Sequence, residues 1–458
     1  MNPPFHKQFS TAGIRLLGSA LVVPALLALP CLAQAAKAAP ALKAAPALTP
    51  TTPATSTTST PQGRIIQVGG NSQIRTIAEA AAMAQDGDTV VIAPGEYFGD
   101  VATWRQDRLT IRAGAGGRVK LIAAGSHAGG KGIWVIGGGR VTVEDIDFVG
   151  ARVPDRNGAG IRFEKGHLVV KRCSFKDSEN GILTAGDPGA TLEIENSEFG
   201  NNGDGSGSTH NLYVGDIGML KVTGSYFHHA RQGHLLKSRA RENRIFHNRL
   251  TDEVGGQASY ELEFPNGGMA YVVGNIIEQS ATTDNSTIIS FGAEGYRSPL
   301  NAIYLASNTI VDDRPQGGIM LRVADGERQV YAVNNLLVGQ GKLDGGQVKG
   351  WRDRLRDIAK AAYYQDSKLL WTKTGIEGRF INNFNVDWSA FALPVRYDYR
   401  LLPKSGLDGK FVLPEEVNGI SLVPNGEYVH PAKWRMLDMK ATVPGALQAL
   451  AASGTGSK

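Results

Sequence analysis

Cysteine is almost absent from this sequence. The 458 residues include two cysteines, Cys31 and Cys173. Cys31 lies in an apolar N-terminal stretch that we expect to be removed, which leaves one thiol in the mature chain. A single cysteine excludes an intrachain disulfide, and the chain also lacks the clustered cysteines of a zinc site. We expect Cys173 to be a packed core thiol.

Long hydrophobic runs and a strong excess of one charge are also missing. Beyond the N-terminus no apolar run reaches the roughly 18 residues that span a membrane, so we expect no membrane span. The formal net charge is +5 and no run of lysine and arginine stands out, which argues against a nucleic-acid partner. Glycine, by contrast, is abundant, with 57 residues. This composition excludes a coiled coil, collagen and a wholly disordered chain.

Residues 1–35 have the three parts of an export signal. Lys7 and Arg15 supply the positive region, an apolar stretch follows, and Ala33-Gln34-Ala35 is an A-x-A cleavage site. Residues 36–62 are rich in Ala, Pro and Thr, and we expect a disordered linker. The sequence therefore predicts an exported protein, periplasmic or secreted, whose folded part begins near residue 63.

Eight segments share one pattern, in which a strand of alternating apolar residues is followed by a small or polar residue and an apolar anchor. The anchors recur at intervals of 23 to 33 residues. Self-similarity on this scale is the mark of a solenoid. The anchors are Phe148, Phe175, Phe199, Phe227, Leu250, Ile277, Ile310 and Leu337.

The position two residues before each anchor forms a polar row. From the second repeat on, it holds Cys173, Ser197, Ser225, Asn248, Asn275, Asn308 and Asn335. Stacked asparagines can hydrogen-bond along a solenoid and satisfy its buried turns. This ladder resembles that of right-handed parallel β-helix proteins. Residues 74–100, a short amphipathic helix followed by a turn and a strand, resemble the N-terminal cap of the pectate-lyase-like superfamily. That superfamily includes lyases, hydrolases, esterases, epimerases and non-enzymes, so the resemblance implies a fold and not a reaction.

We therefore predict an all-β chain. Its main domain, residues 63–345, is predicted to be a right-handed parallel β-helix with an N-terminal helical cap. Residues 346–445 are predicted to form a C-terminal capping segment with an amphipathic helix over 351–365, where apolar residues share one face. Residues 446–458 are predicted to be a disordered tail.

A second strand in each coil places side chains in surface rows. Aligning the segments that begin at 210, 234, 260, 287 and 319 puts one leucine or isoleucine of each strand inward. The residues on either side of it are expected to face solvent, and neighbouring coils lie about 4.8 Å apart. One patch should therefore contain Asn211, Tyr213, Lys237, Arg239, Glu261 and Glu263.

Several chemistries fit this patch. Glu261 and Glu263 alternate on one strand, and with an amide oxygen from Asn211 or Asn266 they would hold Ca²⁺. Alternatively, the two carboxylates repel and one acquires the raised pKa of a general acid. Without a function, the patch would be a lattice of exposed ion pairs that join its lysine and arginine to the two glutamates.

Further residues extend the patch on both sides. The candidate substrate-binding residues are Asn211, His210, His234, Asn266 and Arg322. The two histidines begin neighbouring strands, where they either support the site or pack inward. The longest interval contains an extra segment, GAEGYRSP at 292–299, which is expected to place Glu294, Tyr296 or Arg297 beside the patch.

Residues 233–268 resemble the catalytic region of the chondroitinase B and alginate lyase group. The resemblance rests on Lys237-Ser238, Asn243, Asn248 and Gly255-Gly256. In that group the lysine is the proton-abstracting base, so the resemblance implies this role for Lys237. The chain departs from the group where the strand 260–263 replaces the family's arginine and where 232–234 replaces acidic metal ligands. The resemblance therefore supports a carbohydrate-active surface more than that particular mechanism.

We expect a monomeric polysaccharide lyase that acts on an acidic, uronate-containing polysaccharide by β-elimination. This reaction needs a cation at the uronate carboxylate, a base for the C5 proton and an acid for the leaving oxygen. Arg239, or Ca²⁺ bound by Glu261 and Glu263, would supply the cation; Lys237 would be the base and Tyr213 the acid. A glycoside hydrolase that uses the two glutamates, an epimerase and a non-catalytic polysaccharide-binding protein remain alternatives.

Overall fold

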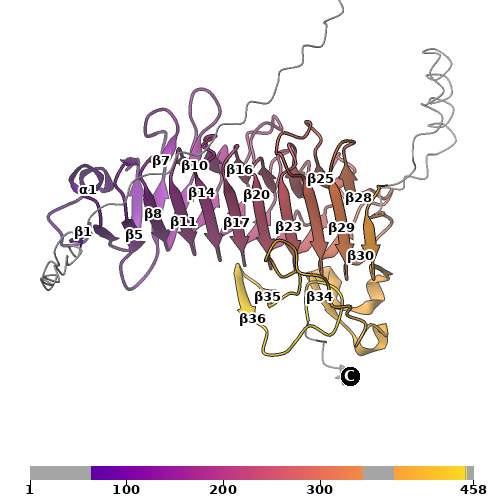
Figure 1. The fold of residues 1–458 in the computed structure, drawn as a ribbon. Helices are drawn as coiled ribbons and strands as arrows, with labels where there is room; N and C mark the ends of the chain where they lie inside the picture. The colour runs from indigo at the N-terminus through magenta and orange to yellow at the C-terminus, as the bar shows by residue number, and fades with distance from the viewer. Residues whose placement is uncertain (1–62, 344–375, 449, 451–458) are drawn as a thin grey trace, which may run out of the picture. The chain divides into compact units, whose positions relative to one another are not determined.

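The computed structural model of this chain describes residues 63–343, 376–448 and 450. Among these residues, nearly all strands belong to three parallel sheets, A, B and C, and each coil of the chain passes through them in that order (Figure 1). This arrangement confirms the predicted all-β parallel β-helix. The predicted signal (1–35), linker (36–62), amphipathic helix (351–365) and most of the tail lie outside the described residues.

The strands of the three sheets follow one another at the spacing of the sequence repeat. Sheet A contains β1 (Ile65–Val68), β2 (Thr89–Ile92), β5 (Leu109–Ala113), β8 (Arg140–Glu144), β11 (His167–Lys171), β14 (Thr191–Glu195), β17 (Met219–Thr223), β20 (Glu242–Phe246), β23 (Met269–Val273), β26 (Ala302–Ala306), β29 (Gln329–Val333) and β31 (Arg379–Ile381). Sheet B contains β3 (Gly95–Phe98), β6 (Val119–Ile122), β9 (Ile146–Val149), β12 (Ser174–Lys176), β15 (Glu198–Gly200), β18 (Tyr226–His228), β21 (Arg249–Thr251), β24 (Ile276–Gln279), β27 (Thr309–Asp312), β30 (Leu336–Val338) and β32 (Phe384–Val386). Sheet C contains β4 (Ala102–Trp104), β7 (Gly132–Ile136), β10 (Ala159–Phe163), β13 (Asn180–Thr184), β16 (Leu212–Val214), β19 (Leu236–Ser238), β22 (Leu262–Phe264), β25 (Thr287–Phe291) and β28 (Ile319–Val323).

The predicted anchors stack in sheet B. Phe148, Phe175, Phe199 and Phe227 are register partners on successive strands, and the same row continues through the remaining anchors to Leu337. The four phenylalanine rings are stacked with centroids 4.6 to 4.9 Å apart. This distance equals the spacing of neighbouring strands, so each coil contributes one ring to a continuous interior column.

The predicted asparagine ladder is also present. Asn248 donates from its backbone and side-chain nitrogens to Asn275 Oδ1 at 2.9 and 3.0 Å, and Asn275 does the same to Asn308. The ladder continues through Asn335 to Asn383. These buried amides satisfy the turns between sheets A and B, which would otherwise carry unpaired polar groups. Cys173 lies in the same row and is buried, as predicted.

A short helix closes the first coils. α1 (Ile77–Met83) begins at Thr76, whose side chain accepts from the Glu79 N–H while the Glu79 carboxylate accepts from the Thr76 N–H. This capping box is a standard way to satisfy the first N–H groups of a helix. Ile77 and Ala80 of the helix belong to the interior cluster of the coils, which confirms the predicted N-terminal helical cap.

The parallel sheets extend beyond residue 345, where we predicted the β-helix to end. β31 pairs with β29 in sheet A and β32 pairs with β30 in sheet B, so residues 379–386 add further strands to the solenoid. No helix among the described residues has the length and apolar character needed to cross a membrane.

Residues 387–448 pack against those sides of the β-helix that sheets A and B form. Phe391 and Tyr399 share one apolar cluster with outward residues of sheet B, and Leu422 shares another with outward tyrosines of sheet A. Ala446, in the predicted disordered tail, is buried and donates its N–H to Thr309 Oγ1. The elements of this segment are η2 (Trp388–Ala390), β33 (Phe391–Leu393), η3 (Pro394–Arg396), β34 (Asp398–Leu401), η4 (Pro403–Ser405), β35 (Gly426–Val429) and β36 (Lys433–Met436).

Candidate active site on the outer face of sheet C

Strand register confirms the predicted row on sheet C, but two of its members, Glu263 and Ser290, are buried and do not face solvent as predicted. Leu212, Leu236, Leu262, Ile289 and Leu321 are partners on successive strands and are buried. The residue after each of them points to the opposite face, because side chains alternate along a strand. That outer row is Tyr213, Lys237, Glu263, Ser290 and Arg322.

Lys237 lies between two carboxylates. Its Nζ is 3.1 Å from Glu263 Oε2 on the next strand and 3.1 Å from Glu294 Oε1 in the loop after β25. The first contact lies within the row, because Lys237 and Glu263 are direct register partners, and the second comes from the loop. The amine is therefore held at a fixed place on the outer face.

Arg239 is the second cation of the patch. Its Nη1 and Nη2 donate to the two oxygens of Glu294 at 2.7 and 3.1 Å, and Nη1 also donates to Asn266 Oδ1. Its Nε donates to the Tyr213 hydroxyl at 2.9 Å. The guanidinium is thus oriented by three residues, and these hydrogen bonds outweigh the effect of burial and raise its pKa. An arginine fixed in this way presents its fork to a carboxylate.

Two buried histidines lie behind the cations. His234 Nδ1 is 3.1 Å from Glu263 Oε2, and the His234 backbone N–H donates to His210 Nδ1 at 3.0 Å. Burial lowers the pKa of both histidines, and for His210 the nearby charges of His234, Lys237 and Arg239 lower it further. Because His210 Nδ1 accepts a hydrogen bond, the proton of the neutral ring is on Nε2.

Glu263 binds this cluster together. Burial alone would raise the pKa of its carboxyl group, but the hydrogen bond from His234 and the charges of His234 and Lys237 hold the pKa below its usual range. The side chain is only 4% exposed. Glu263 is therefore a buried carboxylate that orients two of its neighbours.

The predicted placement of Glu261 beside Glu263 is wrong. Glu261 is fully buried, and its neighbours in the stack are Leu235 and Ile288 of the hydrophobic interior. Burial raises the pKa of its carboxyl group, and the nearby charges of acidic residues raise it further; these residues are Asp252, Glu278 and Asp312. The strand begins only at Leu262, so Glu261 belongs to the corner between sheets B and C, where the chain turns inward. The alternation of a strand does not apply to a residue that precedes it.

Asn211 is also inside and not on the outer face. Its Oδ1 accepts from the backbone and side chain of Asn202, and its Nδ2 donates to the His228 carbonyl. Asn211 lies at the same corner two coils earlier, just before β16, and it turns inward there as Glu261 does. Asn211 therefore does not reach the patch for which it was predicted.

The predicted calcium site does not fit this geometry. The Glu261 carboxylate lies in the interior, whereas Glu263 is engaged by His234 and Lys237. Over residues 63–343 and 376–448, no group of three or more His, Cys, Asp or Glu side chains is arranged to hold a metal ion. The structure therefore does not place the two carboxylates side by side, as the predicted Ca²⁺ ligand pair requires.

The remaining predicted residues take different positions. Asn266 is buried beside Arg239, and its Nδ2 donates to the Gly295 carbonyl of the loop. Arg322 is exposed at the far end of the row. In the loop, Glu294 reaches both cations, but Tyr296 turns inward and donates to the Ala324 carbonyl. The long interval in the repeat was the signal for this loop, but it could not show which side chain reaches the patch.

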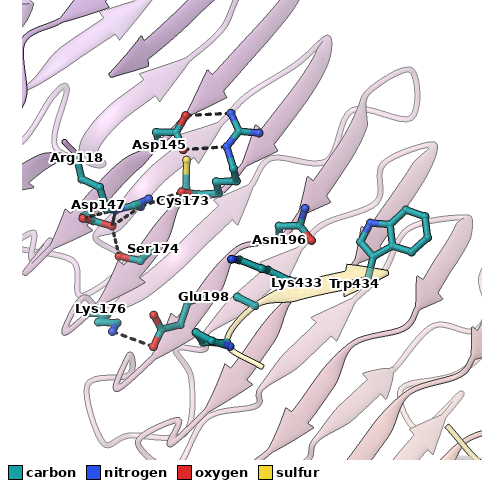
Figure 2. Close-up of a pocket in the computed structure, with 13 residues that line it drawn as sticks. Arg118, Asp145, Asp147, Cys173, Ser174, Lys176, Asn196, Glu198, Lys433 and Trp434 are labelled. Carbon is teal, nitrogen blue, oxygen red and sulfur yellow. Dashed lines mark hydrogen bonds and ion pairs between the residues drawn. The ribbon is translucent and has the colours of Figure 1, made fainter. Parts of the chain in front are cut away.

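A groove lies between sheet B and the antiparallel hairpin formed by β35 and β36. Figure 2 shows its lining, which includes Arg118, Cys173 and Trp434, and its volume is about 570 Å³. Its three carboxylates already hold cations: Asp147 pairs with Arg118, and Asp145 and Glu198 pair with an arginine and a lysine in the same way. Burial raises the pKa of the Cys173 thiol to about 12, which removes it as a nucleophile. The outer face of sheet C is therefore the stronger candidate.

A family model supports the fold. The family described as "Right handed beta helix region" matches residues 122–277. Together with the three parallel sheets, this match identifies the chain as a right-handed parallel β-helix protein. The crystal structure of pectate lyase Pel9A aligns with a TM-score of 0.44 and 14% sequence identity over 79% of this chain and 96% of that chain. No curated protein matches the sequence.

Proposed function

We propose that this protein is an exported polysaccharide lyase that cleaves a uronate-containing polymer by β-elimination on the outer face of sheet C. The observation that carries this proposal is the pair of cations, Lys237 and Arg239, which already hold a carboxylate between them, that of Glu294. A uronate presents the same group to the protein. Export is proposed from residues 1–35 of the sequence.

The residues of the patch supply the three parts of the reaction. Arg239 neutralises the uronate carboxylate, which makes the C5 proton more acidic. Once Lys237 has released its ammonium proton to solvent, its amine accepts the C5 proton, the electron pair of that bond forms the C4–C5 double bond, and the C4–O bond breaks. The Tyr213 hydroxyl accepts a hydrogen bond from Arg239 Nε at 2.9 Å, and it donates its own proton to the leaving oxygen. Glu263 positions Lys237 and His234 for these steps.

The outer face suits a long substrate. Arg162 on β10 and Arg322 on β28 stand on the same outer row, on opposite sides of the patch. The C-terminal segment packs on sheets A and B. A polymer that follows the row across successive coils would therefore meet positive groups at several of its units.

Hydrolysis by two carboxylates is less consistent with the site. Glu263 and Glu294 each lie 3.1 Å from the same Lys237 nitrogen, so their nearest oxygens are no more than about 6 Å apart, near the separation of a retaining glycosidase. A glycosidase also needs one protonated carboxyl group with a raised pKa. Here the cations lower the pKa of Glu263, and that of Glu294 to about 2. Neither group is therefore available as an acid.

An absorbance screen tests the proposal. The purified chain is offered alginate, polygalacturonate, glucuronan and glycosaminoglycans, with and without Ca²⁺, and formation of unsaturated uronate is followed. We expect one polymer to give a product and Lys237→Met to lower the rate about 10²–10⁴-fold, because general-base catalysis contributes this much.

Lys221→Met is the matched control. Lys221 is an exposed lysine on sheet A that also pairs with a glutamate, Glu193, at 3.3 Å. Its replacement should leave the rate unchanged. Binding of a polymer without any product would point to a non-catalytic binding protein, and retained activity in Lys237→Met would remove Lys237 as the base.

A further inference from the structure

The Glu294 carboxylate covers the two cations of the patch. Its side chain is 41% exposed, whereas those of Lys237 and Arg239 are 12% and 18% exposed. The carboxylate therefore lies on the solvent side of both. It comes from the loop after β25 and not from the stacked rows of sheet C.

The contacts of Glu294 are those that a substrate carboxylate would make. Arg239 donates to both of its oxygens from two guanidinium nitrogens, at 2.7 and 3.1 Å, and Lys237 adds a third contact at 3.1 Å. A forked arginine–carboxylate pair with a flanking lysine is a strong and directional way to bind this group. One carboxylate fills the arrangement, so a second cannot bind there at the same time.

Glu294 can leave without a movement of its loop. Its backbone N–H donates to the Pro265 carbonyl at 2.8 Å, and the next turn is tied down by the bond from Arg297 N–H to the Asn266 carbonyl. Tyr296 anchors the loop to the interior through Ala324. Only the exposed side chain of Glu294 has to rotate into solvent for the cations to become free.

We propose that Glu294 is a built-in occupant of the carboxylate subsite, and that the carboxylate of a uronate unit displaces it when substrate binds. This inference rests on the proposed function, because it assigns the same two cations to the substrate. Displacement exchanges one carboxylate for another and leaves the cations paired.

Such an exchange selects for the free acid. A uronate replaces all three contacts that Glu294 gives up, whereas a neutral or esterified sugar leaves Arg239 without its partner. Leaving a charged group without its partner is costly, so the neutral ligand does not displace Glu294. The occupant therefore acts as a filter for unesterified uronate units.

Equilibrium binding tests this inference independently of turnover. Oligomers of galacturonate, glucuronate and mannuronate, and the methyl esters of the galacturonate series, are titrated into wild type and Glu294→Gln by calorimetry at low salt. We expect the dissociation constant of the best acidic oligomer to fall about tenfold in Glu294→Gln, because the occupied state no longer competes with the ligand. The dissociation constants of the methyl esters should fall by a smaller factor.

Glu415→Gln is the matched control. The Glu415 carboxylate accepts from Nη1 and Nη2 of Arg379 on β31 of sheet A, at 3.1 and 2.9 Å, so it forms the same forked pair away from sheet C. It should leave the dissociation constant unchanged, and Arg239→Gln combined with Glu294→Gln should abolish the gain. The melting temperature of each variant shows whether it is folded.

Three results would overturn the inference. An equal gain in Glu415→Gln would attribute the effect to net charge alone. Weaker or unchanged binding in Glu294→Gln would make Glu294 a substrate ligand or a bystander, and the proposed lyase function would stand. Binding of none of the acidic oligomers by either protein would contradict the proposed function together with the inference.

Discussion

Glu261 and Glu263 are separated by one residue, yet they lie in opposite environments. Glu263 is on the outer face of sheet C, where His234 and Lys237 each approach it within 3.1 Å. Glu261 is in the interior, and no other residue that the structure describes donates a hydrogen bond to its carboxylate oxygens. The pKa of Glu263 is held below its usual range, whereas burial raises that of Glu261 well above it.

The difference shows where function and stability are separated in this fold. A residue on the outer row can take on chemistry without disturbing the stacked interior, because only its own face of the strand is involved. A residue at the corner enters the interior, where an unpaired carboxyl group costs stability. Substitutions on the outer row should therefore change activity, and substitutions at the corner should change stability.

On the outer side, a large loss of activity is expected when Arg239 is replaced. Arg239→Gln removes the fork that neutralises the substrate carboxylate, and we expect kcat/KM to fall about 10²–10³-fold, as for the loss of one oxyanion-binding group. The melting temperature should change little. Arg241→Gln is the control, because Arg241 is exposed and pairs with Asp216. Full activity in Arg239→Gln would show that the outer row does not carry the reaction.

Loss of an interior amide whose hydrogen bonds are all made should lower the stability of the protein without a direct effect on the site. Asn275 accepts from Asn248 and donates to Ile245 O and Asn308 Oδ1. Asn275→Ala leaves these groups unpaired, and we expect the melting temperature to fall by about 5–10 °C. The exposed Asn157 provides the matched Asn157→Ala control. An unchanged melting temperature would mean that the ladder does not stabilise the coils.

Replacement of the interior carboxyl group of Glu261 should instead raise the melting temperature. Glu261→Leu places an apolar side chain between Leu235 and Ile288, and we expect the melting temperature at pH 8 to rise by about 2–4 °C. The pKa of Glu261 is higher in the folded state than in the unfolded state. The folded protein is therefore most stable below the unfolded-state pKa, where this carboxyl group is protonated in both states, and it loses stability as the pH rises. The gain in Glu261→Leu should therefore be smaller at pH 5.

Glu261→Gln is the isosteric control for this prediction, since it removes the ionisation and keeps the shape. Its effect on the melting temperature should change between pH 5 and pH 8 in the same direction as that of Glu261→Leu. A fall in melting temperature for both variants at pH 8 would mean that the carboxylate has a stabilising partner, and the contrast with Glu263 would disappear.

The sequence contained most of the fold because its repeat is regular. The anchors from Phe148 to Leu337 and the asparagines from Asn248 to Asn335 identified the stacking direction, since each coil repeats the same interior positions. Register on sheet C followed from one inward leucine in each strand. The end of the β-helix was harder to place, because residues 379–386 rejoin the sheets after a segment without the repeat.

The site was only partly accessible to the same argument. Alternation correctly placed Tyr213, Lys237 and Glu263 in one row, because all three lie within strands. It failed for Asn211 and Glu261, which precede their strands and follow the geometry of the corner. The contact of Glu294 with Lys237 depends on how a loop folds back over the sheet, and no periodicity encodes that path.

The mass of the products from the polymer that the protein degrades tests the central claim most directly. β-Elimination breaks the C4–O bond without taking up water, so each new non-reducing end is unsaturated and each such product is lighter by one water than the hydrolytic product. We predict these unsaturated masses for wild type and their loss in Lys237→Met. Saturated products that have taken up water, or no cleavage of any uronate polymer, would contradict the account.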